Sequence, residues 1–177
     1  MSKRSPGKFE KIPNDLYRTW DARAVARLLP HLMPGTVFVE PCAGAGDLVD
    51  QLVMAGHRCL AAYDIAPLRA DIQRADALDL RWKTSTGLWI TNPPWTRSIM
   101  HAIIKTLCVQ APIWLLFDAD WVHCDQAVPY LIYLRKIVSV GRLKFIPNSP
   151  HDGNDNCAWH LFDGTRPPGS IEFFGRR

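Results

Sequence analysis

The sequence contains no uninterrupted run of about 18 apolar residues, so we expect no membrane-spanning segment. Its first residues, MSKRSPGK, lack the apolar stretch of a secretory signal. The five cysteines are odd in number and irregularly spaced, which argues against a disulfide framework. These absences together predict a cytoplasmic protein that does not associate with membranes.

Signatures of metal and triphosphate sites are also missing. No Cys-x-x-Cys or His-x-x-x-His pair is present, and His151, Cys157 and His160 lack the spacing of zinc ligands. We therefore expect no metal site. No glycine is followed by Lys-Ser or Lys-Thr, which excludes a P-loop.

The size and charge of the chain indicate one globular domain with a weakly basic surface. It has 177 residues, of which 47% are hydrophobic and 21% are charged. A net charge of +4 permits a polyanionic partner without requiring one. Residues 1–13 are polar and contain Pro6, Gly7 and Pro13, so they are predicted to form a flexible basic arm. Residues 14–177 are predicted to form the single domain.

Apolar runs typical of buried strands alternate with helical patterns along the chain. Strands are predicted at residues 36–40, 59–64, 88–91, 113–117, 137–145 and 157–162, and helices at 21–29, 47–55, 67–74, 98–109 and 127–134. Continuous apolar strands that alternate with helices favour an α/β fold, in which a mostly parallel sheet is covered by helices on both faces. The last two strands have no clear helix between them, which predicts a hairpin and one antiparallel strand.

The first predicted strand runs into a glycine turn, EPCAGAGDL, over residues 40–48. Gly44 and Gly46 allow the backbone to turn tightly and to approach a ligand. Val49 stands where a dinucleotide-binding turn would have its third glycine. Asp47 would repel a pyrophosphate at the start of the following helix. A positively charged nucleoside without phosphates fits better, and S-adenosylmethionine is such a ligand.

Two carboxylates follow the next strand positions. Asp64 ends the second strand and is predicted to accept hydrogen bonds from ribose hydroxyls; the alternative is a helix N-cap for the segment near Pro67. Asp76, with Ala77 and Leu78 after it, could accept a hydrogen bond from an adenine amino group. An ordinary solvated turn would explain Asp76 equally well.

The strand at residues 88–91 ends in Asn92-Pro93-Pro94-Trp95. The Asn92 side-chain oxygen and the Pro93 carbonyl could accept the two N–H groups of an aromatic amine and so localise its lone pair for attack on a methyl group. The two prolines stiffen this turn. Trp95 could stack on the base. The alternative is a strand-ending turn with a tryptophan packed in the core.

These segments resemble known motifs when they are taken together. Glu40-Pro-x-x-Gly-x-Gly, Asp64, Asp76 and Asn92-Pro-Pro-Trp95 resemble motifs I to IV of the class I S-adenosylmethionine-dependent amino-methyltransferases, in particular the small phage-type DNA adenine-N6 methyltransferases. The likeness spans roughly residues 13–165. It implies a Rossmann-like sheet of seven strands with the last strand antiparallel. Those enzymes more often have Tyr or Phe where this chain has Trp95.

The resemblance also implies which residues form the site. The catalytic residues would be Asn92, Pro93, Pro94 and Trp95. The cofactor S-adenosylmethionine would be bound by Tyr17, Thr19, Glu40, Pro41, Cys42, Ala43, Gly44, Gly46, Asp64, Ile65, Asp76, Ala77 and Asn92.

The implied activity is methyl transfer to the N6 amine of adenine in DNA, with the base flipped out of the duplex. The chain leaves no room for a separate target-recognition domain, so the basic arm, the loop at 146–156, or a second subunit or second copy would contact the nucleic acid. Two alternatives remain open. The same chemistry could act on an RNA base or a protein glutamine amide, or the chain could be a non-catalytic partner that binds nucleic acid.

Overall fold

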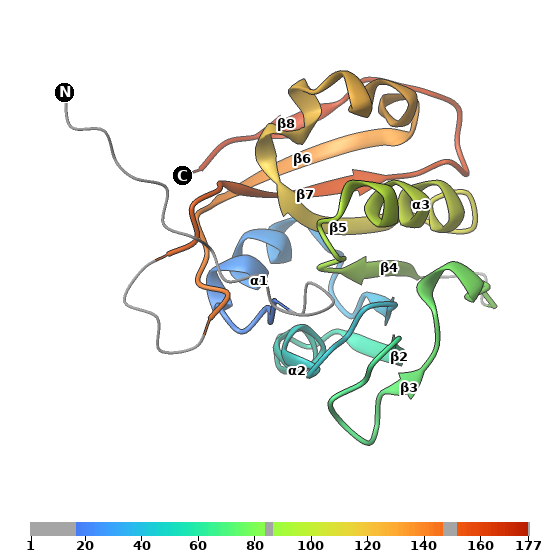
Figure 1. Cartoon of the computed structure of the whole chain (residues 1–177), viewed down its shortest axis with the longest axis vertical. Helices are drawn as coiled ribbons and strands as arrows, with labels where there is room; N and C mark the ends of the chain where they lie inside the picture. Colours follow the sequence, from blue (N-terminus) through green and yellow to red (C-terminus); the bar gives the residue numbers. More distant parts are fainter. Residues whose placement is uncertain (1–16, 84–86, 147–151, 177) are drawn as a thin grey trace.

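The computed structural model describes residues 17–83, 87–146 and 152–176. The predicted basic arm at 1–13 and part of the loop at 146–156 lie outside these ranges. All strands of the described part join one sheet in the order β3-β2-β1-β4-β5-β7-β6-β8 (Figure 1). No helix in these ranges is long and apolar enough to cross a membrane. All five cysteines are free thiols.

The elements follow the alternation expected from the sequence. The strands are β1 (Val37–Glu40), β2 (Arg58–Asp64), β3 (Gln73–Arg74), β4 (Leu88–Thr91), β5 (Ile113–Asp118), β6 (Leu134–Gly141), β7 (Cys157–Phe162) and β8 (Glu172–Phe174). The α-helices are α1 (Ala22–Leu28), α2 (Asp47–Met54) and α3 (Arg97–Leu107). Short 3₁₀ helices are η2 (Leu29–His31), η3 (Ala77–Asp79), η4 (Ala119–His123) and η5 (Asp125–Tyr133).

The expected α/β architecture, with a mostly parallel sheet, is confirmed. Strands β1 to β5 pair in parallel, and β7 is antiparallel to both β5 and β6. The sheet has eight strands rather than the expected seven, because β8 pairs in parallel with β6 beyond the antiparallel strand. The antiparallel strand is therefore β7 and not the last strand of the chain.

Two predicted helices are wrong. Residues 67–74 form turns that end in β3, because Leu68 donates its backbone N–H to the Gly44 carbonyl at 3.0 Å instead of starting a helical ladder. Residues 127–134 lie largely in the 3₁₀ helix η5, which contains Pro129. Proline has no backbone N–H to donate, so an α-helix is disfavoured there.

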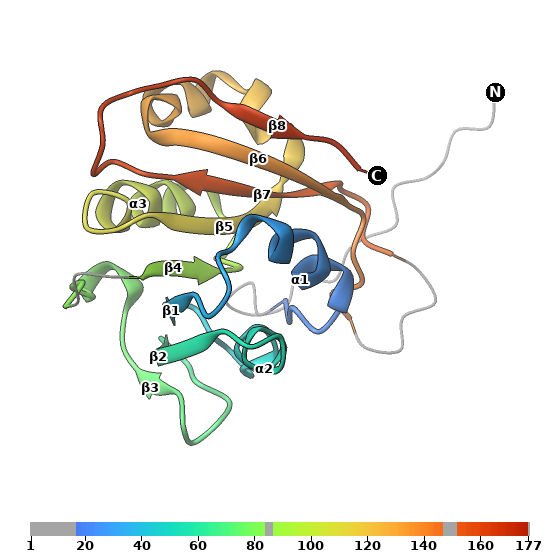
Figure 2. The ribbon, with the colours of Figure 1, turned by 180° about the vertical axis from the view of Figure 1, so that it is seen from behind.

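The helices cover both faces of the sheet, as expected. Buried Ala24, Val25 and Leu28 of α1 pack with α2 against one face, where Trp114 and Trp159 lie; Figure 2 shows α1 in front of that face. The apolar residues of α3 recur at helical spacing and pack against the other face, in front of the sheet in Figure 1.

The strand order places several functional segments at one edge. The chain leaves β1 toward β2 on one side, and β4 lies on the other side of β1. Ligands of such sheets bind at this switch point, outside the carboxyl ends of the strands. Strands β1, β2, β4, β5 and β6 all end on the same side, which we call the carboxyl edge.

Candidate functional site

A pocket of about 530 Å³ opens at the carboxyl edge, where the segments that follow β1, β2 and β4 meet. It is lined by Tyr17, Arg18, Thr19, Glu40, Pro41, Cys42, Ala43, Gly44, Ala45, Asp47, Leu48, Asp64, Ile65, Leu68, Asp76, Ala77, Leu78, Asn92, Pro94, Thr96, Ile99 and Ile103. Twelve of the thirteen residues predicted to contact the cofactor are in this lining; Gly46 is not. Of the predicted catalytic residues, Asn92 and Pro94 line the pocket, whereas Pro93 and Trp95 do not.

The glycine turn is held by its neighbours. Gly44 and Gly46 have φ values of 53° and 83°, in the left-handed region that favours glycine. A Cβ atom on Gly46 would lie 2.5 Å from the guanidinium carbon of Arg69, which in turn pairs with Asp50 and Asp71. Gly46 is therefore required for close packing under Arg69 rather than for contact with the pocket.

Asp64 links the glycine turn to the loop after β2. One carboxylate oxygen accepts the Gly44 N–H at 2.7 Å, and the other accepts the Ala66 N–H at 2.7 Å. The predicted alternative, a helix N-cap, does not apply because no helix follows. A carboxylate has about four acceptor positions, and the side chain lines the pocket. It can still accept hydrogen bonds from a ligand.

Asp76 forms a capped turn and also lies at the pocket wall. Its carboxylate caps η3 by accepting the Leu78 N–H at 2.9 Å. It also lines the pocket together with Ala77 and Leu78. The turn thus places one acidic and two apolar side chains at the pocket wall.

Glu40 is the most unusual charged group of the pocket. It is 2% exposed, and its Oε2 atom has no hydrogen-bond partner. Burial, followed by the nearby carboxylates of Asp64 and Asp47, raises the pKa of Glu40 well above its ordinary value. Glu40 also lines the pocket, so a cationic group of a ligand placed next to it would offset the cost of this buried acidic group.

Cys42, two residues further on, is not suited to act as a nucleophile. Burial raises the pKa of its thiol, and the carboxylates of Asp64 and Glu40 raise it further. The thiolate, which is the reactive form, is therefore disfavoured. Cys42 lines the pocket, so any role in binding a ligand would be a packing contact and not covalent chemistry.

The Asn92 amide is held by two hydrogen bonds. Its Nδ2 donates to the Tyr17 carbonyl oxygen at 3.0 Å, and its Oδ1 accepts from the Trp95 indole Nε1 at 3.1 Å. A carbonyl can only accept and an indole N–H can only donate, so these partners define the orientation of the amide. The oxygen predicted to accept an amine is thus already bonded to Trp95, a contact that sequence analysis missed.

Trp95 is half-buried and packs against both core clusters. Its ring meets Phe145 edge-on at 5.5 Å between centroids, and Phe145 meets Tyr17 at 6.1 Å. The alternative of a tryptophan packed in the core is therefore partly realised. Phe145 links the segment after β6 to both partners of Asn92.

Asp47, at the start of α2, is paired rather than free. Arg18 donates from Nε and Nη2 to its two carboxylate oxygens at 2.7 and 2.6 Å. The expectation that a bare Asp47 carboxylate would repel a pyrophosphate needs correction, because Arg18 offsets the charge. No local pattern in the sequence joins these residues, which are 29 positions apart.

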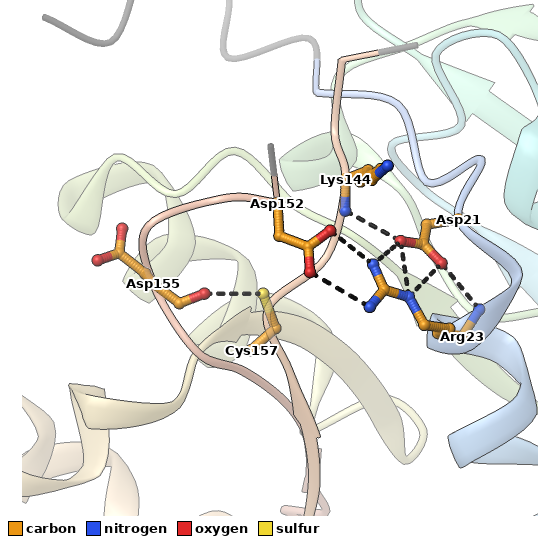
Figure 3. A network of polar contacts seen from close by, with 6 residues as sticks. All are labelled: Asp21, Arg23, Lys144, Asp152, Asp155 and Cys157. Carbon is orange, nitrogen blue, oxygen red and sulfur yellow. Dashed lines mark hydrogen bonds and ion pairs between the residues drawn. The ribbon is translucent and has the colours of Figure 1, made fainter. Parts of the chain in front are cut away.

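A polar network ties the N-terminal segment to the connection between β6 and β7 (Figure 3). The Asp21 carboxylate caps α1, as predicted, and also accepts the Lys144 backbone N–H at 3.0 Å. Arg23 bonds to Asp21 at 2.6 Å and to Asp152 at 3.0 Å. The network keeps Phe145, next to Lys144, against Tyr17 and Trp95.

Comparison with known proteins identifies the fold. No protein-family model and no curated sequence matches the chain. Among solved structures, a Listeria monocytogenes protein assigned to the class I S-adenosylmethionine-dependent methyltransferases aligns with a TM-score of 0.55 at 8% identity, over 87% of this chain and 62% of that one. The chain has the Rossmann-like fold of these methyltransferases.

Two further solved structures share this fold. The M protein of the type I restriction enzyme EcoKI aligns with a TM-score of 0.52 at 13% identity, over 88% of this chain and 47% of that one. The 23S rRNA methyltransferase ErmE aligns with a TM-score of 0.54 at 15% identity, over 84% and 69%. The chain thus spans less than two thirds of the Listeria and EcoKI proteins.

Proposed function

We propose that the protein transfers a methyl group from S-adenosylmethionine to the exocyclic N6 amine of adenine in DNA. The observation that carries this proposal is that Glu40 and Asn92 line the same pocket. Glu40 offers an unsatisfied acceptor for a cationic ligand, and Asn92 offers an oriented amide for an amine. Because the five cysteines are free thiols, we place the activity in the reducing cytoplasm.

The residues of the pocket fit the chemical groups of S-adenosylmethionine. Glu40 would accept from the ammonium group, and Asp64 would accept from the ribose hydroxyls with its remaining lone pairs. Asp76 would accept from the adenine amino group, with Ile65 and Leu78 against the ring. When bound, this cofactor supplies an electrophilic methyl group on a sulfonium centre.

Asn92 would act on the methyl acceptor. The lone pair of an adenine amine is delocalised into the ring, so the amine is a weak nucleophile. Acceptance of its two N–H groups by Asn92 Oδ1 and the Pro93 carbonyl would localise the lone pair and stabilise the positive charge that develops. Pro93 does not line the pocket, so its carbonyl must become accessible when the substrate binds. An incoming amine would take the place of the Trp95 indole N–H on Asn92 Oδ1. No general base is required before the attack: the methylated amine would lose one proton to solvent, and the neutral thioether of the cofactor would be the leaving group.

The choice of DNA adenine rests on the Asn-Pro-Pro-aromatic motif and on its likeness to DNA adenine methyltransferases. The EcoKI M protein belongs to a restriction enzyme, which is consistent with a DNA substrate. ErmE acts on RNA, so an RNA base is the second candidate. We propose further that a second copy or another subunit contributes to target recognition.

A labelling experiment tests the proposal. The protein is incubated with methyl-labelled cofactor and, in parallel, with DNA, RNA and cell protein, and the product is digested to identify the modified nucleoside or residue. We expect label in N6-methyladenine of DNA. Label in RNA or in glutamine would show that RNA or protein, and not DNA, is the substrate. No transfer to any of the three would favour a non-catalytic binding role.

The matched variant is Asn92→Ala. It should reduce methyl transfer by at least about 100-fold, the scale of losing one oriented donor or acceptor at a transition state. Cofactor affinity, measured by calorimetry, should change little. Unchanged turnover in this variant would refute the role of Asn92.

A further inference from the structure

The charge pattern of the carboxyl edge separates two groups of basic residues. Arg18, Arg23, Arg69 and Arg97 each form an ion pair with an aspartate. Arginines held in this way are largely neutralised. They are poorly placed to bind a further anion.

Three other basic residues at this edge are not paired. Arg142 and Lys144 follow β6, and Arg176 follows β8. Within residues 17–83, 87–146 and 152–176, none of the three forms an ion pair. Lys144 bonds to Asp21 only through its backbone N–H, and Figure 3 shows no contact of its ammonium group with the carboxylates drawn. Two exposed carboxylates lie in the same loop: Asp152 pairs with Arg23, and Asp155 forms no ion pair with a described residue.

The topology brings these residues together. Strands β6 and β8 run in parallel, so both end at the carboxyl edge. The Arg176 side chain lies over the end of β6, because a Cβ atom on Gly141 would be 2.8 Å from its Nη1. Arg176 is therefore next to the residue that precedes Arg142.

The same segment leads to the candidate acceptor site. Phe145 follows Lys144 and contacts the Trp95 ring, which bonds to Asn92. Three residues of extended chain span on the order of 10 Å, about three base-pair rises along the axis of a duplex. The basic positions thus follow one another from Arg176 through residues 142–144 toward the amide that would hold the target base.

We propose that Arg142, Lys144 and Arg176 form a phosphate-binding track for the DNA backbone beside the target adenine. This inference rests on the proposed nucleic-acid substrate. Arginine guanidinium groups bind phosphate oxygens with two parallel hydrogen bonds, and each phosphate neutralised releases counterions from the duplex. The track supplies affinity and orientation without reading the sequence.

The test compares the salt dependence of binding to a labelled duplex by fluorescence anisotropy. The double variant Arg142→Ala/Arg176→Ala should make the negative slope of log K against log salt less steep by roughly 1.8, or about 0.9 for each lost phosphate contact. The matched control is Arg58→Ala/Lys105→Ala. It removes the same charge from exposed positions at the start of β2 and in the last turn of α3, on the opposite edge of the sheet. Its slope should stay close to that of the wild type.

Equal slopes for the two double variants would overturn the track, as would a change seen with single-stranded RNA but not with the duplex. The single variant Arg142→Gln, at an exposed position, should make the slope less steep by roughly 0.9 and guards against misfolding of the double variant. Wild-type transfer of label to DNA is measured in parallel. Transfer with an unchanged slope would refute the track alone, whereas failure of the wild type to bind the duplex would refute the track and the DNA substrate together.

Discussion

Replacing Glu40 by Gln tests the assignment of the cofactor pocket more directly than any other change. Glutamine has nearly the shape of a protonated glutamate but cannot ionise. In the structure, Glu40 is 2% exposed and its Oε2 has no partner. If this oxygen accepts from the cofactor ammonium group, the substitution removes a charge-assisted hydrogen bond.

The expected loss of affinity follows from that bond. A hydrogen bond to a charged group contributes about 1.5–3 kcal/mol, so the dissociation constant should rise roughly 10- to 150-fold. Burial, then the Asp64 carboxylate, raises the pKa of Glu40. Below that pKa the wild type must release a proton before the Glu40 carboxylate can bind the ammonium group, and this reduces the net free energy of binding. The loss should therefore be largest at high pH, where Glu40 is already ionised.

The Glu40→Gln variant should bind the cofactor more weakly but should have a larger free energy of unfolding than the wild type. The folded pKa of Glu40 lies above the ordinary value of 4.5. Between these two values the folded state keeps a proton that the unfolded state has released, so the wild type loses stability as pH rises through this window. Glu40→Gln escapes this loss, and its free energy of unfolding should exceed that of the wild type increasingly as pH rises, up to the folded pKa.

Calorimetry measures the predicted loss of cofactor affinity, and thermal unfolding measures the predicted gain in stability. Titration in two buffers of different ionisation enthalpy should show proton release on binding by the wild type and none by Glu40→Gln. S-adenosylhomocysteine is the control ligand, because it keeps the ammonium group but lacks the sulfonium charge. Its affinity should fall as much as that of S-adenosylmethionine. A variant that binds both ligands as tightly as the wild type, without proton release in either protein, would refute the assignment.

Two further substitutions test neighbouring features. Trp95→Phe removes the indole N–H from Asn92 Oδ1 but keeps a ring. Because the amine no longer has to displace this hydrogen bond of about 0.5–1.5 kcal/mol, kcat/KM for methyl transfer should rise roughly 2- to 10-fold. Trp95→Ala, which also removes the ring, should lower kcat/KM. Equal losses in both variants would argue against displacement of the indole. Gly46→Ala should lower Tm by roughly 2–8 °C, because alanine is strained by about 1–2 kcal/mol in left-handed backbone and Arg69 must move. Gly169→Ala, where nothing lies within 4 Å, is the control and should leave Tm nearly unchanged.

The parts of the fold that were predictable are those in which the signal is local. Strands β4 and β7 have the predicted bounds, because each is a buried apolar run that ends at a change of composition. Strands β3 and β8 were not predicted. They are short and exposed, and they exist because their backbones pair with a neighbouring strand. A pairing of this kind leaves no periodicity in the sequence.

The candidate site also contains residues that were predictable from the sequence and contacts that were not. Residues that follow a strand, such as Glu40, Asp64 and Asn92, were predictable because parallel strands end at a common edge. The bond between Asn92 and the Tyr17 carbonyl joins positions 75 residues apart. Phe145 belongs to a further segment, and no local pattern indicated that it packs against Trp95. Contacts between distant segments depend on the packed fold.

The charge balance of the pocket bears on which ligand it selects. Sequence analysis ascribed the exclusion of a pyrophosphate to Asp47, but Arg18 pairs with that carboxylate through two hydrogen bonds. An ion pair at the start of α2 presents little net charge to a ligand. Glu40 is one of the residues that line the pocket, and its buried Oε2 has no hydrogen-bond partner among the described residues. A diphosphate placed near Glu40 would meet a buried acidic group, whereas an ammonium group would be attracted to it. The proposed preference for a cationic nucleoside therefore depends on Glu40, and breaking the Arg18–Asp47 pair should affect it less.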